Sequence, residues 1–163
     1  MIAIYPGTFD PVTNGHINII KRSLKIFDSI IIGVAKNLQK KPLFSDSERL
    51  MMIEKALAEK NVKGCKVEIF EGLLVDFVKK HNSKIIIRGL RAISDFEFEL
   101  QMAFMNRELD KSIEMLFLMP SIKYSFLSSS IVKNVFFHNG CIKEMVPSIV
   151  AKMMKEKVKG EKR

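Results

Sequence analysis

Tryptophan is absent from the 163-residue chain, and Cys65 and Cys141 are its two cysteines. They form no C-x-x-C pair and are too few for a disulfide framework or a zinc site. This cysteine usage favours a reducing environment. We therefore predict a cytoplasmic protein.

Long apolar runs are also missing from the sequence. No stretch approaches the roughly 18 residues that a membrane-spanning helix needs. The first residues lack the charged and apolar regions of a signal peptide. The sequence therefore predicts a soluble chain with no membrane partner.

Two common phosphate-binding motifs do not occur. The sequence contains no G-x-x-x-x-G-K-[ST] loop and no G-x-G-x-x-G turn after a strand-like run. The interpretations as a P-loop kinase and as a Rossmann dehydrogenase lose their main support.

The charge balance favours anionic partners without choosing among them. With 27 basic and 18 acidic side chains the net charge is +9, which suits phosphates, nucleic acid or an acidic membrane. A hydrophobic content of 47% is enough for one sizeable core, and no linker or repeat marks a second one. We predict a single domain over residues 1–158 and a basic, frayed tail over residues 159–163.

Short β-branched runs alternate with segments of helical periodicity along most of the chain. The runs predicted as strands cover residues 2–5, 30–34, 66–70, 84–87 and 115–118. The segments predicted as helices cover residues 16–27, 46–59, 73–81, 95–109, 129–137 and 148–157. This alternation predicts an α/β fold: a Rossmann-like open parallel five-stranded sheet with helices on both faces. Ligands of such sheets bind beyond the carboxyl ends of the strands.

The loop from Gly7 to His16 follows the first predicted strand and leads directly into a helix. A helix N-terminus offers unpaired N–H groups and a positive dipole end, which suit a phosphate. Gly7 and Gly15 would let the backbone approach a ligand closely. Alternatively, the glycines only turn the chain and His16 caps the helix.

Three further features follow strands at the same predicted edge. Arg88 and Arg91 suit bidentate phosphate contacts, although they could instead pair with Asp95, Glu97 or Glu99. Ser128, Ser129 and Ser130 begin a helix, either as simple N-caps or as phosphate ligands. Residues 36–42 form a basic loop that alone would be read as a solvated charge run. Together with the loop from Gly7 to His16, these features predict a phosphate site.

Two signatures in these loops resemble the nucleotidylyltransferase superfamily. Residues 5–11 with 13–16 match its first signature, and residues 127–133 resemble its second. Residues 87–91 and 95–107 resemble one family within it, the bacterial phosphopantetheine adenylyltransferases. The similarity covers nearly the whole chain except the basic tail.

The resemblance implies a specific reaction of coenzyme A biosynthesis. The 4′-phosphate of phosphopantetheine would attack the α-phosphorus of ATP, giving dephospho-coenzyme A and pyrophosphate with Mg²⁺ present. Neither a covalent protein intermediate nor a metal site made of protein ligands is expected. The family precedent also suggests a homohexamer and feedback by coenzyme A.

The resemblance also assigns roles to residues. His16 would stabilise charge at the α-phosphate, and Thr8 would orient the attacking phosphate. The acceptor would contact Thr8, Lys40, Leu74, Arg88 and Asn106. The ATP site would comprise Thr8, Phe9, His16, Gly89, Leu90, Arg91, Glu99, Tyr124, Ser125, Phe126, Leu127, Ser128, Ser129 and Ser130. The chain departs from familiar members at Phe98, Tyr124 and Asn134, which bears on the acceptor site and not on the reaction.

Two rival interpretations remain open. A nicotinamide-mononucleotide adenylyltransferase or a cytidylyltransferase would share the loop from Thr8 to His16 and the three serines, but the segment 88–91 and the short chain favour the pantetheine enzyme. A basic nucleic-acid-binding domain would bind with steep salt dependence. Because the sequence has no aromatic-interleaved basic signature, we expect no nucleic-acid partner.

Overall fold

The computed structural model describes residues 1–36, 42–91 and 93–161. The strands are β1 (Ile2–Gly7), β2 (Ser29–Ala35), β3 (Cys65–Phe70), β4 (Ile85–Gly89) and β5 (Glu114–Leu118). The helices are α1 (Asn14–Ser23), α2 (Asp46–Glu59), α3 (Leu74–Lys80), α4 (Ile93–Leu109), α5 (Ser129–Phe137) and α6 (Ser148–Glu161), with a 3₁₀ turn η1 (Ile122–Tyr124) before α5.

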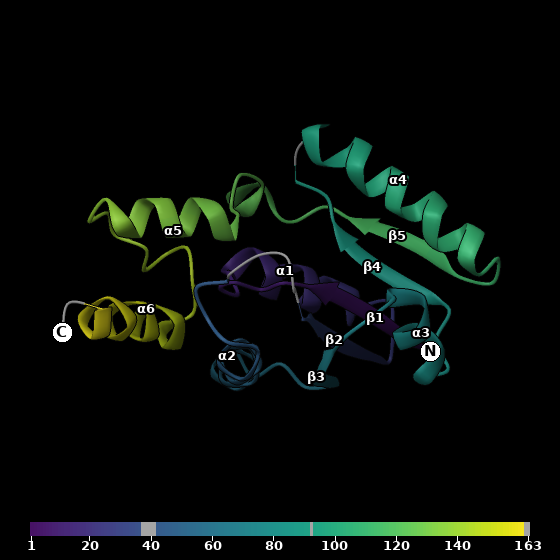
Figure 1. Cartoon of the computed structure of the whole chain (residues 1–163), viewed down its shortest axis with the longest axis horizontal. Helices are drawn as coiled ribbons and strands as arrows, with labels where there is room; N and C mark the ends of the chain where they lie inside the picture. Colours follow the sequence, from purple (N-terminus) through teal and green to yellow (C-terminus); the bar gives the residue numbers. More distant parts are fainter. Residues whose placement is uncertain (37–41, 92, 162–163) are drawn as a thin grey trace.

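The five strands form one parallel sheet in the order β3-β2-β1-β4-β5 (Figure 1). The central strand β1 pairs with β2 and β4, so that Ile4 lies between Ile31 and Ile86. The predicted Rossmann-like open parallel sheet is thereby confirmed.

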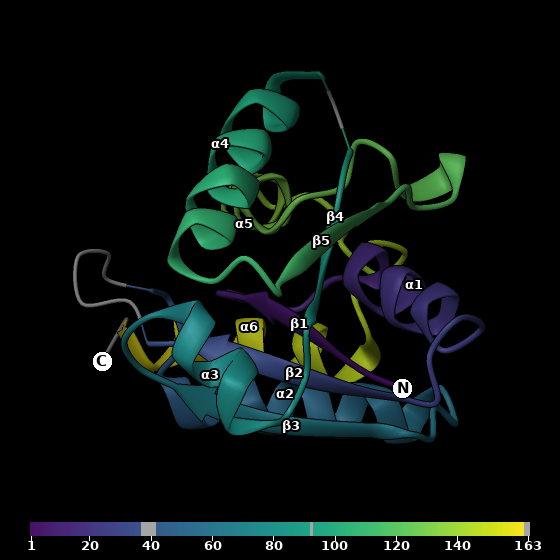
Figure 2. The same ribbon diagram turned by 90° about the vertical axis from the view of Figure 1, so that its right-hand side faces the viewer.

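Helices cover both faces of the sheet, and each face has its own buried core. One core contains Ile20 of α1, Met52 of α2 and Met154 of α6. The other contains Ile4 and Ile86 of the sheet and Val78 of α3. In Figure 2, α3 and α4 lie on one side of β4, and α1 lies on the other. No helix among the described residues is both long and apolar enough to cross a membrane.

Local signals explain where several helices begin. Helix α2 starts with the predicted capping box, because the Ser45 hydroxyl accepts the Glu48 N–H at 3.2 Å and the Glu48 carboxylate accepts the Ser45 N–H at 2.7 Å. Helices α2 and α5 have the predicted bounds. Such caps satisfy N–H groups that the first helical turn leaves unpaired.

The C-terminal ends of α1 and α6 differ most from the prediction. Helix α1 ends at Ser23 and not at Phe27, because the Ser23 carbonyl accepts the N–H groups of both Ile26 and Phe27 in a tighter turn. Helix α6 continues to Glu161, beyond the predicted end at residue 157. The helical backbone therefore enters the segment predicted as a frayed tail, whose residues 162–163 lie outside the described residues.

The topology places chemistry at one edge. Because all strands are parallel, the loops after β1, β4 and β5 emerge at the same edge, and α5 and α6 lie beyond the carboxyl ends (Figure 1). The N-termini of α1 and α5 begin in these loops. This is the edge at which the sequence predicts a ligand site.

Candidate active site

A cavity of about 360 Å³ opens at the carboxyl edge of the sheet. Its walls come from the loops after β1, β4 and β5 and from the first turns of α1 and α5. The cavity brings together most of the predicted site residues: Thr8, Phe9, His16, Arg88, Gly89, Arg91, Glu99, Tyr124, Leu127, Ser128, Ser129 and Ser130. Three of the four sequence features thus meet in the cavity, whereas of the described residues of the basic loop Pro42 lines it and Lys36 pairs with Glu71 instead.

His16 closes the first turn of α1 as well as lining the cavity. The Thr13 backbone N–H donates to Nδ1 of His16 at 3.0 Å, and the His16 N–H donates to the Thr13 hydroxyl at 3.3 Å. Because Nδ1 accepts a hydrogen bond, the neutral ring carries its hydrogen on Nε2. The ring therefore offers one N–H donor to a ligand in the cavity.

The surroundings of His16 keep its ring neutral. Burial, followed by the positive charges of Arg91 and Arg88, lowers the pKa of His16 to about 3. The Phe9 ring packs edge-on against the imidazole, with ring centroids 5.1 Å apart. A neutral donor beside two guanidinium groups suits negative charge that develops on a phosphate.

The backbone turns sharply at Phe9, next to His16. Phe9 has a φ of +51°, in the left-handed region that residues other than glycine rarely adopt. This conformation folds its ring over Gly7, where an added Cβ would lie 2.9 Å from the Phe9 Cζ. Gly7 is therefore required for close packing beneath the ring.

Arg88 forms a fixed pair with Glu99 of α4. Its Nε and Nη2 donate to the two carboxylate oxygens at 2.7 and 2.5 Å, and Nη1 donates to the Pro6 carbonyl at 2.7 Å. The pairing that the sequence left as an alternative therefore occurs for Arg88. It occurs in the cavity wall, so it holds the guanidinium plane in place for a ligand.

Arg91 and the serines join the other two loops. Nη1 of Arg91 donates to the Leu127 carbonyl at 3.3 Å. Ser128 is the N-cap of α5 and accepts the Ile131 N–H at 3.1 Å, whereas the Ser129 hydroxyl donates to the Pro11 carbonyl at 2.7 Å. The capping alternative is thus correct for Ser128, and the N-terminus of α5 still faces the cavity.

Comparison with known proteins assigns the chain to a family. Residues 4–135 match the family described as cytidylyltransferase-like. A relative from Thermodesulfovibrio yellowstonii, named phosphopantetheine adenylyltransferase, is 54% identical over 157 residues, which are 96% of either chain. A relative of the same name from Dictyoglomus thermophilum is 55% identical over 95% of this chain and 93% of its own. The chain belongs to the phosphopantetheine adenylyltransferase family. The resemblance seen in the sequence is confirmed.

Solved structures support the fold of this phosphopantetheine adenylyltransferase family member. A candidate nicotinate-nucleotide adenylyltransferase from Vibrio parahaemolyticus superposes with a TM-score of 0.71 at 16% identity, over 95% of this chain and 91% of its own. A lipopolysaccharide core biosynthesis protein from Thermoplasma volcanium gives 0.52 at 24% identity, over 74% of this chain and 96% of its own. At these identities the likeness concerns the fold alone.

Several residues assigned by resemblance to the family do not line the cavity. Leu90, Ser125 and Phe126 belong to the loops that build it but are not among its lining residues. Leu74 begins α3 and packs against the second core, and the buried Asn106 directs its amide to the Met115 sulfur at 3.7 Å. These assignments, together with that of Lys40 outside the described residues, stay predictions.

Asp10 and Lys133 also line the cavity, although neither is a predicted site residue. The Lys133 ammonium lies 2.8 Å from the Asp10 carboxylate. The helical periodicity does indicate Lys133, because it follows Ser129 by about one helical turn and therefore lies on the same face of α5. Among the described residues no group of three or more His, Cys, Asp or Glu side chains could hold a metal ion.

The environment of His16 predicts that its ring does not titrate near neutral pH. With a pKa of about 3, the imidazole stays neutral as the pH falls from 8 to 5, and its Nδ1 keeps the bond from Thr13. Heteronuclear NMR of the ring nitrogens should show the Nε2–H tautomer with constant shifts over this range. A titration midpoint near the ordinary value for histidine, roughly 6.5, would contradict this picture.

Proposed function

We propose that the chain transfers AMP from ATP to 4′-phosphopantetheine, giving dephospho-coenzyme A and pyrophosphate, in coenzyme A biosynthesis. The observation that carries the proposal is the cavity itself, where a neutral histidine, two arginines and two helix N-termini surround a space suited to phosphates. The names of relatives more than 50% identical over nearly the whole chain support the same reaction.

The reaction requires placement and charge stabilisation more than proton transfer. The attacking phosphate is already an anion, so a strong general base is unnecessary. We assign Thr8 to orienting this phosphate, and the Nε2–H of His16 to an oxygen of the α-phosphate. The donor is preorganised by its bond to Thr13, so it needs no rearrangement as charge develops.

The two substrates share the cavity. ATP would extend along Phe9, the segment 89–91, Glu99 and residues 124–130, with its phosphates at the N-termini of α1 and α5. The acceptor phosphate would lie between Thr8 and Arg88, with Lys40 as a further cation. Leu74 and Asn106 are assigned to the pantetheine arm.

Mg²⁺ is proposed as the metal, carried by the triphosphate of ATP. Magnesium sites at nucleotides use one or two carboxylates together with phosphate oxygens, and no protein cage is needed. Asp10 and Glu99 are the carboxylates that line the cavity, and both already have cationic partners. The residues therefore fit an ion held mainly by the nucleotide, which would neutralise charge on the leaving pyrophosphate.

Association with copies of the same chain is proposed from the surface of α4. Phe98 and Phe104 are both 61% exposed, and Met105 is 58% exposed. Large apolar side chains gathered on one helix are typical of an interface. The proposed number of subunits, six in a homohexamer, is taken from the family resemblance.

Two further proposals follow from the acceptor and the cysteines. Coenzyme A carries the same pantetheine arm as the acceptor, so it would compete at that position as a feedback ligand. Cys65 and Cys141 are free thiols, which agrees with a cytoplasmic protein.

Acceptor choice tests the proposed reaction. Pyrophosphate release from ATP should require 4′-phosphopantetheine and should be absent with nicotinamide mononucleotide. CTP should not replace ATP. A coupled assay run on all combinations in parallel measures this directly, and turnover with another acceptor alone would overturn the assignment.

Loss of the His16 donor tests its role. The substitution His16→Ala should lower kcat by roughly 10²–10³-fold, because one transition-state contact is removed. ATP affinity by titration calorimetry should change only modestly. The control is His138→Ala, which removes an exposed histidine at the C-cap of α5 and should leave kcat unchanged. Equal kcat values for the two variants would make His16 structural.

A charged substitution on the apolar surface of α4 tests the proposed assembly. The substitution Phe104→Lys places a charge in the interface, so light scattering should report a smaller particle than for the unchanged chain. The control Ile26→Lys changes a side chain of similar exposure, 58%, in the turn after α1 and should keep the full mass. A monomeric unchanged chain, with a mass near 18.7 kDa, would refute the assembly.

A further inference from the structure

Arg49, outside the cavity, is the largest fully buried side chain among the described residues. It lies in the first turn of α2, and its guanidinium reaches back to the end of the sheet. Nη1 donates to the Thr8 carbonyl at 2.5 Å and to the Ala35 carbonyl at 3.0 Å, while Nη2 pairs with the Asp46 carboxylate. A buried charge is costly unless its partners are well placed.

These contacts extend the pairing of β1 and β2 beyond its last residue pair. The register between β1 and β2 ends with Gly7 opposite Val34, and Thr8 and Ala35 are the next residues on each chain. Nη1 of Arg49 bridges their carbonyls, so the guanidinium joins the two backbones where the ladder stops. The position of Thr8 is thus fixed by a side chain from another element.

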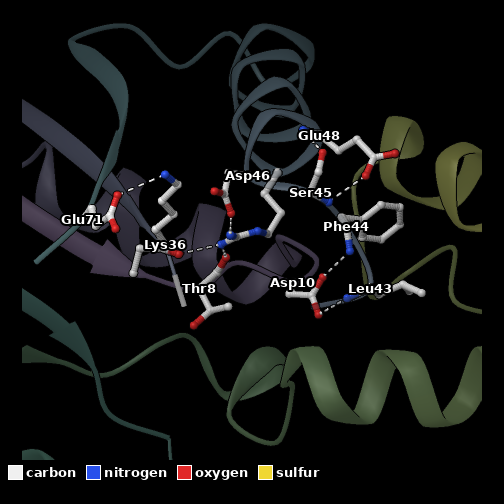
Figure 3. A network of polar contacts seen from close by, with 11 residues as sticks. Thr8, Asp10, Lys36, Leu43, Phe44, Ser45, Asp46, Glu48 and Glu71 are labelled. Carbon is white, nitrogen blue, oxygen red and sulfur yellow. Dashed lines mark hydrogen bonds and ion pairs between the residues drawn. The ribbon is translucent and has the colours of Figure 1, made fainter. Parts of the chain in front are cut away.

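The residues after Thr8 make this support necessary. Phe9 has a φ of +51°, a conformation that persists only when its surroundings hold it. On its far side the Asp10 carboxylate accepts the N–H groups of Leu43 and Phe44, each at 2.9 Å, as Figure 3 shows. The strained turn is therefore held on both flanks, by Arg49 through Thr8 and by Asp10.

The contacts of Arg49 are not those of a group retained for stability alone. Its Nε is buried and has no hydrogen-bond partner within the described part of the chain. Replacing an imperfectly satisfied buried charge and its partners by apolar residues often leaves stability unchanged or improves it. Arg49 instead stands where its hydrogen bonds hold the loop that carries Thr8.

We propose that Arg49 is a positioning residue for adenylyl transfer, which holds the backbone of Thr8 so that its hydroxyl meets the incoming phosphate. This inference rests on the function proposed for Thr8. It assigns to α2 a part in the reaction although Arg49 touches no substrate. A displacement of about 1 Å at such a residue can cost about 10²-fold in rate.

Kinetics of Arg49→Lys and Arg49→Met test the proposal. Lysine carries its donors on a single nitrogen and methionine has none, so neither reproduces the planar fork that spans the two carbonyls and the Asp46 carboxylate, and kcat should fall by about 10²-fold. ATP affinity should change much less than kcat, because the α5 wall of the cavity is untouched. The matched control Ser45→Ala removes the N-cap of α2 and has no contact with Thr8; it should lower the melting temperature and leave kcat near that of the unchanged enzyme.

A double-mutant cycle separates positioning from a structural role. If Arg49 acts through Thr8, Arg49→Lys should cost little further activity once Thr8→Val has removed the hydroxyl. Fully additive losses, or an equal loss of kcat in Ser45→Ala, would overturn the proposal.

Hydrogen exchange tests the same contact without substrate. The amide of Phe9 should exchange faster in Arg49→Lys than in the unchanged chain, whatever the reaction is. Unchanged exchange would refute the positioning role. If the protein without substitutions releases no pyrophosphate with 4′-phosphopantetheine, the proposed function is refuted. The exchange result would still test the contact between Arg49 and Thr8.

Discussion

The Thr13 backbone N–H donates to Nδ1 of His16, and this one bond serves both folding and chemistry. It caps the first turn of α1, whose apolar side packs into the larger core. The same bond selects the tautomer that presents Nε2–H to the cavity, and protonation at Nδ1 would break it. Helix geometry and ligand recognition at this edge therefore depend on a neutral ring.

The charges of the cavity are organised before any ligand arrives. Arg88 is held by Glu99, and Lys133 is held by Asp10, so two of the cationic side chains already have fixed orientations. The carboxylates also reduce the repulsion among the cationic side chains of the cavity. Such preorganisation lets the site stabilise developing charge without first rearranging its own groups. The anchors themselves, Glu99 and Asp10, come from different segments of the chain.

The sequence predicts local structure and the sheet edge at which the loops meet, but not which distant side chains pair with one another. The bounds of α2 and α5 were predicted correctly because caps and apolar periodicity are written within a few residues. The predicted end of α1 was wrong because the Ser23 carbonyl accepts two N–H groups, which apolar periodicity does not reveal. The pairing of Lys133 with Asp10 spans 123 residues and that of Arg49 with Thr8 spans 41, so only the folded chain identifies these partners. Family resemblance named most of the cavity lining, including Glu99, but not Asp10 or Arg49, which hold the loop after β1 in place.

The order of the walls along the chain has a consequence for synthesis on the ribosome. The central strand β1 and its loop emerge first, yet the serines and Lys133 of α5 lie near the other end of the chain. Because α5 is among the last elements to be synthesised, the cavity cannot be complete until the chain is nearly finished.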